Sequence, residues 1–319
     1  IKIAEKFFEN QKKYISLIAI GGYGRKELYP NSDTDLLILI EGKKKKSLQK
    51  PIREFLTFLW DVGIEVSHST RTLNECLKEG RKDVSVATSL IESRYLYGSK
   101  DLFKRFLEKI NKNGAFWRNK KFLEEKMLEQ TNRHLQFNNT AYNLEPNIKN
   151  GPGGLRDLHN IYWIAKKIFS IKSIKELENL KILTKEQIKD FESSWALLSR
   201  IRYSLHKITN RTENRLLFDY QRTLASNFGY KDQKHLLAVE VFMQDYYKAA
   251  KSISRLNEIS LQILEQKILN RTRRKSEQIS SFEIINNLIG LKKDITFADN
   301  PSLLLGIFLQ FQKNKNIKG

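Results

Sequence analysis

Hydrophobic and polar positions follow a strand-like pattern in the first part of the chain. YISLIAI (14–20) and LLILI (36–40) are short β-rich runs between turn residues, and IEVSHS (64–69) alternates apolar and polar positions. Between the last two, LQKPIREFLTFLWDV (48–62) has apolar residues at helical spacing. This order of elements, with a turn and a short helix after the first strand, predicts a small mixed α/β sheet.

The pattern changes to long helical periods from about residue 115. Segment 184–208 begins with Thr184 and Gln187 at capping-box spacing and then repeats apolar residues along one stripe, namely Phe191, Trp195, Leu198, Ile201 and Leu205. A second long helix is predicted over residues 234–268. The second part of the chain is therefore expected to form an all-helical bundle, and the whole chain belongs to the α+β class.

The joint between the two parts is NLEPNIKNGPGGLRD (143–157), whose Pro and Gly residues forbid a continuous helix. We therefore predict a sheet-containing domain over residues 1–142 and a helical domain over residues 143–319.

Composition and charge exclude several classes of protein. No apolar run approaches the ~20 residues that cross a bilayer, so no membrane association is expected. The formal net charge is +21, but acidic residues are interleaved along the chain, which favours a solvated surface over a nucleic-acid partner. The KKKK run at 43–46 is expected to be a solvated loop. A lone cysteine, Cys76, excludes an intramolecular disulfide and a Cys-based zinc cluster, and fits a cytoplasmic protein.

A glycine cluster and two aspartates stand close together in AIGGYGRKELYPNSDTDLLIL (19–39). The stretch does not match the phosphate loop of P-loop enzymes, because Arg25 and Lys26 follow Gly24 and no Ser or Thr stands at the position that the motif requires. The stretch does not match the dinucleotide-binding fingerprint G-x-G-x-x-G/A either, because Glu27 stands where the motif has its last small residue. The next strand also begins too soon for a crossover helix. What remains is a strand that ends in two glycines, a short helix near Gly24, a polar loop and a second strand.

Asp33 and Asp35 are two residues apart at the start of a strand, so their side chains share one face. Two carboxylates in one small volume repel unless cations neutralise them, and hard oxygen ligands suit Mg²⁺. Glu65 is the best candidate for a third carboxylate, which would complete a site for two metal ions, and Asp61 is the weaker option. Glycines at a helix N-terminus let backbone N–H groups approach phosphates.

This combination resembles the DNA polymerase β-like nucleotidyltransferase superfamily. Within it, the chain is most similar to the uridylyltransferase/uridylyl-removing enzymes that modify the nitrogen-regulatory PII protein. The segments that carry the resemblance, in chain order, are GGYGRKELYPNSDTDLLIL, LWDVGIEVSHSTRTLNECL, VATSLIESRYLYG, YNLEPNIKNGPGGLRDLHNIYWIA and NRLLFDYQ. The block GPGGLRDLH is also similar to the related glutamine synthetase adenylyltransferases.

The resemblance implies a Mg²⁺-dependent transfer of UMP from UTP to a tyrosine hydroxyl of the PII signalling protein, with release of pyrophosphate. It implies that Asp33, Asp35 and Glu65 hold two Mg²⁺ ions and form the catalytic set. Full-length members of that family also carry an HD-type hydrolase domain that removes UMP and ACT domains that sense glutamine. None of the five histidines precedes an aspartate, so both activities are expected to be absent from this stretch of chain.

The remaining roles implied by the resemblance concern the nucleotide. Gly21, Gly22 and Ser32 would contact the β- and γ-phosphates, and Arg25 would pair with phosphate charge unless it forms a salt bridge instead. Asn143, Arg156 and Asp157 would lie beside the nucleotide unless Arg156 and Asp157 only cap and pin the helix that begins there. Trp60, Trp163 and Trp195 fall on apolar helical stripes and are expected in the core rather than against a base.

Two alternatives remain open from the sequence. A nucleotidyltransferase with another acceptor, such as glutamine synthetase or the 3′ end of tRNA, would use the same catalytic residues. A catalytically silent module that only docks PII would keep the fold without the reaction.

Overall fold

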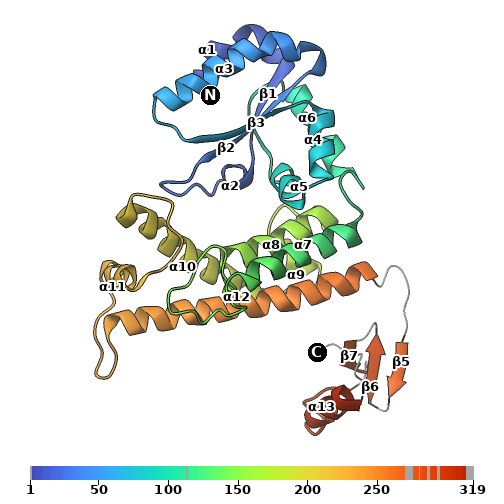
Figure 1. Ribbon diagram of the computed structural model, residues 1–319. Helices are drawn as coiled ribbons and strands as arrows, with labels where there is room; N and C mark the ends of the chain where they lie inside the picture. The colour runs from blue at the N-terminus through green and yellow to red at the C-terminus, as the bar shows by residue number, and fades with distance from the viewer. Residues whose placement is uncertain are drawn as a thin grey trace. The chain divides into compact units, whose positions relative to one another are not determined.

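The computed structural model describes residues 2–112, 114–269, 276–279, 281–285, 288–292 and 295–313. The chain divides into two compact units, Ile1–Leu261 and Gln262–Gly319 (Figure 1). The boundary between the units falls within the long helix α12 (Ala238–Leu269).

A four-stranded mixed sheet forms the first part of the larger unit. Its strands are β1 (Ile15–Ala19), β2 (Thr34–Ile40), β3 (Val66–Arg71) and β4 (Arg94–Gly98), in the order β3-β2-β1-β4. Strand β1 pairs antiparallel with β2 and β4, whereas β2 and β3 are parallel. The three predicted strands and the mixed sheet are confirmed. The sequence pattern did not indicate β4, which is too short and too mixed in polarity to stand out.

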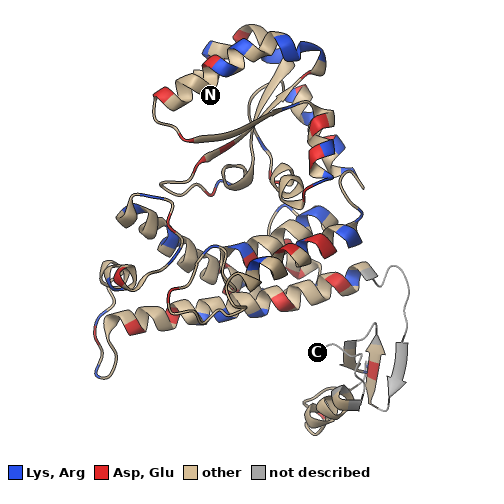
Figure 2. Ribbon diagram, viewed as in Figure 1, with Lys and Arg blue, Asp and Glu red and all other residues tan. Residues whose placement is uncertain are grey.

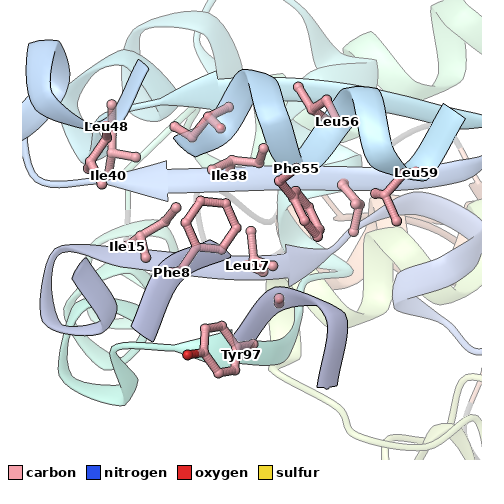
Figure 3. Close-up of a cluster of buried hydrophobic side chains, with 13 residues drawn as sticks. Phe8, Ile15, Leu17, Ile38, Ile40, Leu48, Phe55, Leu56, Leu59 and Tyr97 are labelled. Carbon is pink, nitrogen blue, oxygen red and sulfur yellow. The ribbon is translucent and has the colours of Figure 1, made fainter. Parts of the chain in front are cut away.

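Helices α1 (Lys2–Phe8) and α3 (Lys45–Asp61) bury the apolar core on one face of this sheet (Figure 3). Successive side chains of a strand point to opposite faces. Leu36 and Ile38 therefore point into this core, and Asp35 belongs to the other face. The cluster consists of Ala4, Phe8, Ile15, Leu17, Leu36, Ile38, Ile40, Leu48, Ile52, Phe55, Leu56, Leu59 and Tyr97.

Local capping explains where several helices of the sheet-containing part begin. Thr72 and Glu75 form a capping box at the start of α4 (Leu73–Gly80), and Asp83 accepts hydrogen bonds from the first turn of α5 (Val84–Ile91). The remaining elements of this part are the 3-10 helices η1 (Glu9–Tyr14) and η2 (Gly42–Lys44) and the helices α2 (Gly21–Gly24), α4 (Leu73–Gly80), α5 (Val84–Ile91) and α6 (Lys100–Asn111). The prediction of a loop at 43–46 is wrong, because η2 and the first turn of α3 occupy these residues. A run of lysines does not distinguish a loop from a helix, since exposed lysines are solvated equally well on both.

The second part of the larger unit is helical, as predicted. Helix α10 begins after Thr184, whose side chain and that of Gln187 form the predicted capping box. The apolar stripe of α10 is buried at Phe191, Leu198 and Ile201. The helices are α7 (Asn119–Leu135), α8 (Leu155–Phe169), α9 (Glu176–Asn179), α10 (Lys185–Thr209), α11 (Phe218–Asn227) and α12.

The Gly/Pro-rich joint interrupts the helices as predicted, but residues 151–155 of it are buried. Gly153 has φ +72°, and a Cβ at this position would lie 2.4 Å from the carbonyl oxygen of Ala250 on α12. The joint therefore packs closely against α12 and lies inside the larger unit. The division at residue 143 stays a prediction.

The smaller unit holds a short antiparallel sheet of order β5-β6-β7 and one helix. Its elements are β5 (Ser276–Ile279), β6 (Phe282–Ile285), β7 (Leu288–Leu291) and α13 (Leu303–Lys313). The prediction of an all-helical architecture beyond residue 143 is wrong for these three strands, because apolar runs this short do not distinguish a strand from a helix. Among the described residues, no helix is long and apolar enough to span a membrane.

The packing of α1 generates a stability prediction. Phe8 is fully buried and its ring lies 5.1 Å from that of Phe55, so Phe8→Ala is expected to lower the free energy of unfolding by about 3–5 kcal/mol. The matched control is Phe58→Ala on α3, where the side chain is 38% exposed and the expected loss is below about 1 kcal/mol. Urea denaturation measures both, and equal losses would contradict the role of α1 as a cover of the sheet.

Candidate active site

Asp33 and Asp35 lie where β2 begins, next to the turn that follows β1. The backbone N–H of Ile20 donates a hydrogen bond to the carbonyl of Asp35 at 3.1 Å, which fixes the turn against the strand. Asp35 is partly buried and Asp33 is exposed. Burial and the neighbouring Asp33 carboxylate raise the pKa of Asp35 to about 6. The two carboxylates therefore concentrate negative charge in one place, which a divalent cation would neutralise.

Gly21 is required by the position of Asp35. Its backbone has φ +54°, and a Cβ on it would lie 2.6 Å from the Oδ2 atom of Asp35. Any other residue would push the carboxylate away or change the turn. The two sequence signals, glycine and aspartate, are thus parts of one arrangement. The short helix α2 begins at Gly21, whereas the sequence predicted a helix starting near Gly24.

A cavity of about 250 Å³ lies in front of these residues. It gathers the predicted residues Gly21, Gly22, Arg25, Ser32, Asp33, Asp35 and Arg156. Other side chains around it come from α5, α7, α8 and α10, so both parts of the larger unit build it. Three predicted residues, Glu65, Asn143 and Asp157, do not line this cavity.

Glu65 lies just before β3, and its side chain is exposed. Its carbonyl accepts a hydrogen bond from the N–H of Thr34 at 2.8 Å, which extends the β2–β3 ladder by one residue. Asp35 is in register with Ser67, two residues after Glu65, so Glu65 belongs to the same face of the sheet as Asp35. In the described part of the chain, no three acidic, His or Cys side chains are grouped closely enough to hold a metal ion. The third carboxylate therefore stays a prediction.

Arg25 forms the salt bridges that were the alternative to a phosphate contact. Its Nη1 atom lies 2.6 Å from Glu92 Oε2 and its Nε atom 3.0 Å from Glu27 Oε2, with the Arg25 side chain only 13% exposed. Glu92 also accepts a hydrogen bond from the Trp163 indole, and His159 Nε2 lies 2.8 Å from Glu27 Oε2. We call Arg25, Glu27, Glu92, His159 and Trp163 the wall network, since its charged members form one side of the cavity.

The charges of the wall network are set by burial and mutual pairing. Burial alone would raise the pKa of Glu27, but His159 and Arg25 outweigh it and lower the pKa to about 2. Burial, with the nearby Arg25 charge, lowers the pKa of His159 to about 4. Burial raises the pKa of Glu92 in spite of Arg25. At neutral pH, Glu27 is ionised and His159 is neutral, so Arg25 is held between acids and is not free for a ligand.

Cations from the helical part face the two aspartates. Lys149 lines the cavity with Arg156 and Arg202, and none of the three has an ion pair among the described residues. Burial and the charges of Arg202 and Arg156 lower the pKa of Lys149 to about 8, although Asp33 opposes the shift. Burial also lowers the pKa of Arg156 and of Arg202. Such mutually repelling, partly or fully buried cations are typical of a site that receives a polyanion.

Sequence reasoning missed Lys149, Arg202 and Lys126, because single cations in a chain with 57 Lys and Arg residues give no local signal. Lys126 is buried and its Nζ lies 4.4 Å from the centroid of the Trp163 ring. Trp163 is buried as predicted, and it also lines the cavity. The prediction that Trp60 lies in the core is wrong, because its side chain is 51% exposed.

The remaining residues of the joint have structural contacts. Asp157 is buried and accepts hydrogen bonds from Arg133 Nη2 at 2.7 Å and from the N–H of Gly153 at 2.8 Å. These contacts match the alternative in which Asp157 pins the start of α8. The side chain of Asn143 accepts a hydrogen bond from the N–H of Glu145 at 3.2 Å and so shapes a turn.

Comparisons with known proteins show which family the chain is similar to. The family model described as GlnD PII-uridylyltransferase matches residues 121–261. A bifunctional uridylyltransferase/uridylyl-removing enzyme of Hydrogenovibrio crunogenus is 42% identical over 99% of this chain and 36% of its own length. Those of Nitrosococcus oceani and Pseudomonas aeruginosa are 42% and 41% identical, each over 96% of this chain and 34% of their own length. The chain thus spans about a third of the length of these relatives.

The raised pKa of Asp35 generates a pH-dependent prediction for the chain without divalent ions. The folded-state pKa is about 6 against an ordinary 3.8, so the cost of the Asp35 charge is fully present above pH 6 and disappears as the pH falls towards about 4. Asp35→Asn is therefore expected to stabilise the fold at pH 8 by on the order of 1 kcal/mol, a value reduced by solvent screening of this partly exposed group.

Urea denaturation in EDTA at pH 8 and at pH 4 measures this effect. The control is Asp190→Asn at an exposed position of α10, for which no gain is expected. A gain from Asp35→Asn of the same size at both pH values would show that the Asp35 charge is not its cause.

Proposed function

We propose that the chain is a member of the PII-uridylyltransferase family and that its cavity transfers UMP from UTP to a tyrosine hydroxyl of the PII signalling protein. The observation that carries the proposal is the opposition, within one cavity, of the Asp33–Asp35 pair to Lys149, Arg156 and Arg202. Carboxylates suit divalent ions and the cations suit a triphosphate. A metal-bound nucleoside triphosphate needs both.

In the proposed site, Asp33 and Asp35 hold Mg²⁺, with Glu65 from the neighbouring strand as the third carboxylate of a two-ion site. The donor set fits, because oxygen ligands suit Mg²⁺ and the raised pKa of Asp35 reports charge that a cation would compensate. When bound, Mg²⁺ supplies charge neutralisation of the triphosphate and acidifies the hydroxyl that attacks it. A strong protein base is then not required.

The remaining residues bind and orient the substrate. Lys149, Arg156 and Arg202 bind phosphate oxygens, and Gly21 and Gly22 allow the backbone to approach them, with Ser32 beside the same groups. The tyrosine oxygen bonds to the α-phosphorus while the bond from that phosphorus to the bridging oxygen of pyrophosphate breaks, and the hydroxyl proton is released. The wall network orients the turn without contacting phosphate.

The charge distribution gives no support to a nucleic-acid acceptor. Basic and acidic positions are interspersed along α7 and α12, so these helices offer no continuous basic stripe (Figure 2). A protein acceptor therefore remains the preferred partner. A nucleotide triphosphate substrate and a single buried free cysteine fit a cytoplasmic enzyme.

The test of acceptor and nucleotide is mass spectrometry of the PII protein after incubation with the chain, Mg²⁺ and equal amounts of UTP, ATP, CTP and GTP. The proposal expects a single UMP adduct on a tyrosine. An AMP adduct would overturn the assignment of UTP as the substrate. An adduct on another residue type would overturn the assignment of tyrosine as the acceptor.

The catalytic assignment predicts that Asp35→Asn lowers the transfer rate by at least about 10²-fold, because a direct ligand should cost no less than the groups that only orient one. Glu65→Gln is expected to have a similar effect if Glu65 is the third ligand. Asp190→Asn, at an exposed position of α10 that does not line the cavity, serves as the matched control with unchanged rate. Full activity of Asp35→Asn would refute the proposed mechanism, and full activity of Glu65→Gln alone would remove Glu65 from the site.

The glycine turn generates a second prediction. Gly21→Ala would push a Cβ against Asp35, whereas Gly63 has a similar positive φ of +76° but open space around it. The two variants therefore share the cost of a left-handed backbone, and only Gly21→Ala disturbs the carboxylate. Calorimetric titration with Mg²⁺ and UTP should show at least about tenfold weaker binding for Gly21→Ala only. Equal binding by both variants would argue against the proposed role of Gly21.

A further inference from the structure

A second cavity, of about 530 Å³, lies on the other side of the wall network. Arg25, Glu27, Glu92 and His159 line both cavities, so the two cavities are adjacent and share these residues. The second cavity is otherwise formed by residues that follow α2, by the start of β4, by α8 and by α10, all within the larger unit. The proposed reaction makes no use of it.

Four cations face this second cavity: Lys26, Arg94, Lys166 and Lys172. In the part of the chain that the structure describes, none of them has an ion pair. Of the acids that line the cavity, Glu27 and Glu92 are engaged by the wall network. Glu192 lies 3.8 Å from Lys175. The cavity therefore has a surplus of positive charge that a small anion would complement.

The other surfaces of this cavity are apolar and aromatic. Tyr162 from α8 and Phe191 and Trp195 from α10 line it, and the Nζ atom of Lys166 lies 5.5 Å from the centroid of the Tyr162 ring. Ser93 also lines this cavity, and its Oγ atom is buried without a hydrogen-bond partner among the described residues. A concave apolar surface with a few convergent polar groups is typical of a small-molecule site.

We propose that this second cavity binds a small organic anion with an aromatic or aliphatic body, and that such a ligand modulates nucleotide binding through the shared wall network. The anionic group would pair with Lys166 and its neighbouring cations, and the body would lie against Trp195 and Phe191. Because Arg25 belongs to the wall network and directly follows the glycine turn, a ligand that shifts Arg25 changes the nucleotide cavity. Binding at the two cavities is then reciprocally coupled.

The probe for this proposal is the aromatic sulfonate dye 8-anilinonaphthalene-1-sulfonate, titrated by fluorescence. Lys166→Met, which keeps the length of the side chain and removes its charge, is expected to weaken dye binding by at least about fivefold. The matched control is Lys167→Met, the next residue of α8, which does not line the cavity and whose Nζ lies 5.7 Å from the Phe116 ring centroid. Equal effects of both variants, or none, would overturn the site.

A second variant and a competition complete the test. Trp195→Leu should weaken dye binding without altering the circular dichroism spectrum, and unchanged binding would overturn the aromatic contact. Saturating Mg²⁺ and UTP should change the dye dissociation constant without displacing the dye. Full displacement would assign the dye to the nucleotide cavity, and an unchanged constant would overturn the coupling. The dye titrations alone do not depend on the proposed function. The coupling rests on the proposed binding of UTP, which calorimetric titration with Mg²⁺ and UTP checks separately.

Discussion

The buried pairing of Arg25 with Glu92 and Glu27 is the interaction on which the arrangement of the site depends. The Glu92 side chain is 1% exposed, so its charge has almost no solvation by water and must be compensated within the protein. Arg25 supplies that compensation from the end of the glycine turn, and Trp163 supplies a hydrogen bond from α8. One desolvated acid thereby holds the turn that carries Gly21 in a fixed position relative to the helical part.

The opposition of charges across the cavity follows from this connection. The sheet-containing part contributes Asp33 and Asp35, which repel each other, and the helical part contributes Lys149, Arg156 and Arg202, which also repel one another. Each group is electrostatically unfavourable without a ligand. A metal-bound polyphosphate would relieve both repulsions at once.

Much of the fold follows from local sequence. Strands β1 and β2 are short apolar runs between turns, and the capping pair Thr184 and Gln187 marks the start of α10, because capping involves groups only three residues apart. The Gly/Pro-rich joint was recognisable as a break in the helices, but its close packing against Ala250 depends on a helix about a hundred residues later in the chain. Local pattern carries no information about such a contact.

For the site, the sequence by itself determined the glycines and the aspartates, because they are close in the chain and their chemistry depends on strand and turn geometry alone. Only the tertiary structure decided what opposes them. In the tertiary structure, Arg25 pairs with buried acids, and Asp157 holds the start of α8 in place. Lys149 and Arg202 are the cations, among many similar ones in the sequence, that line the cavity. The physical reason is that ion pairing and burial depend on distances between segments far apart in the sequence, which no residue pattern within one segment encodes.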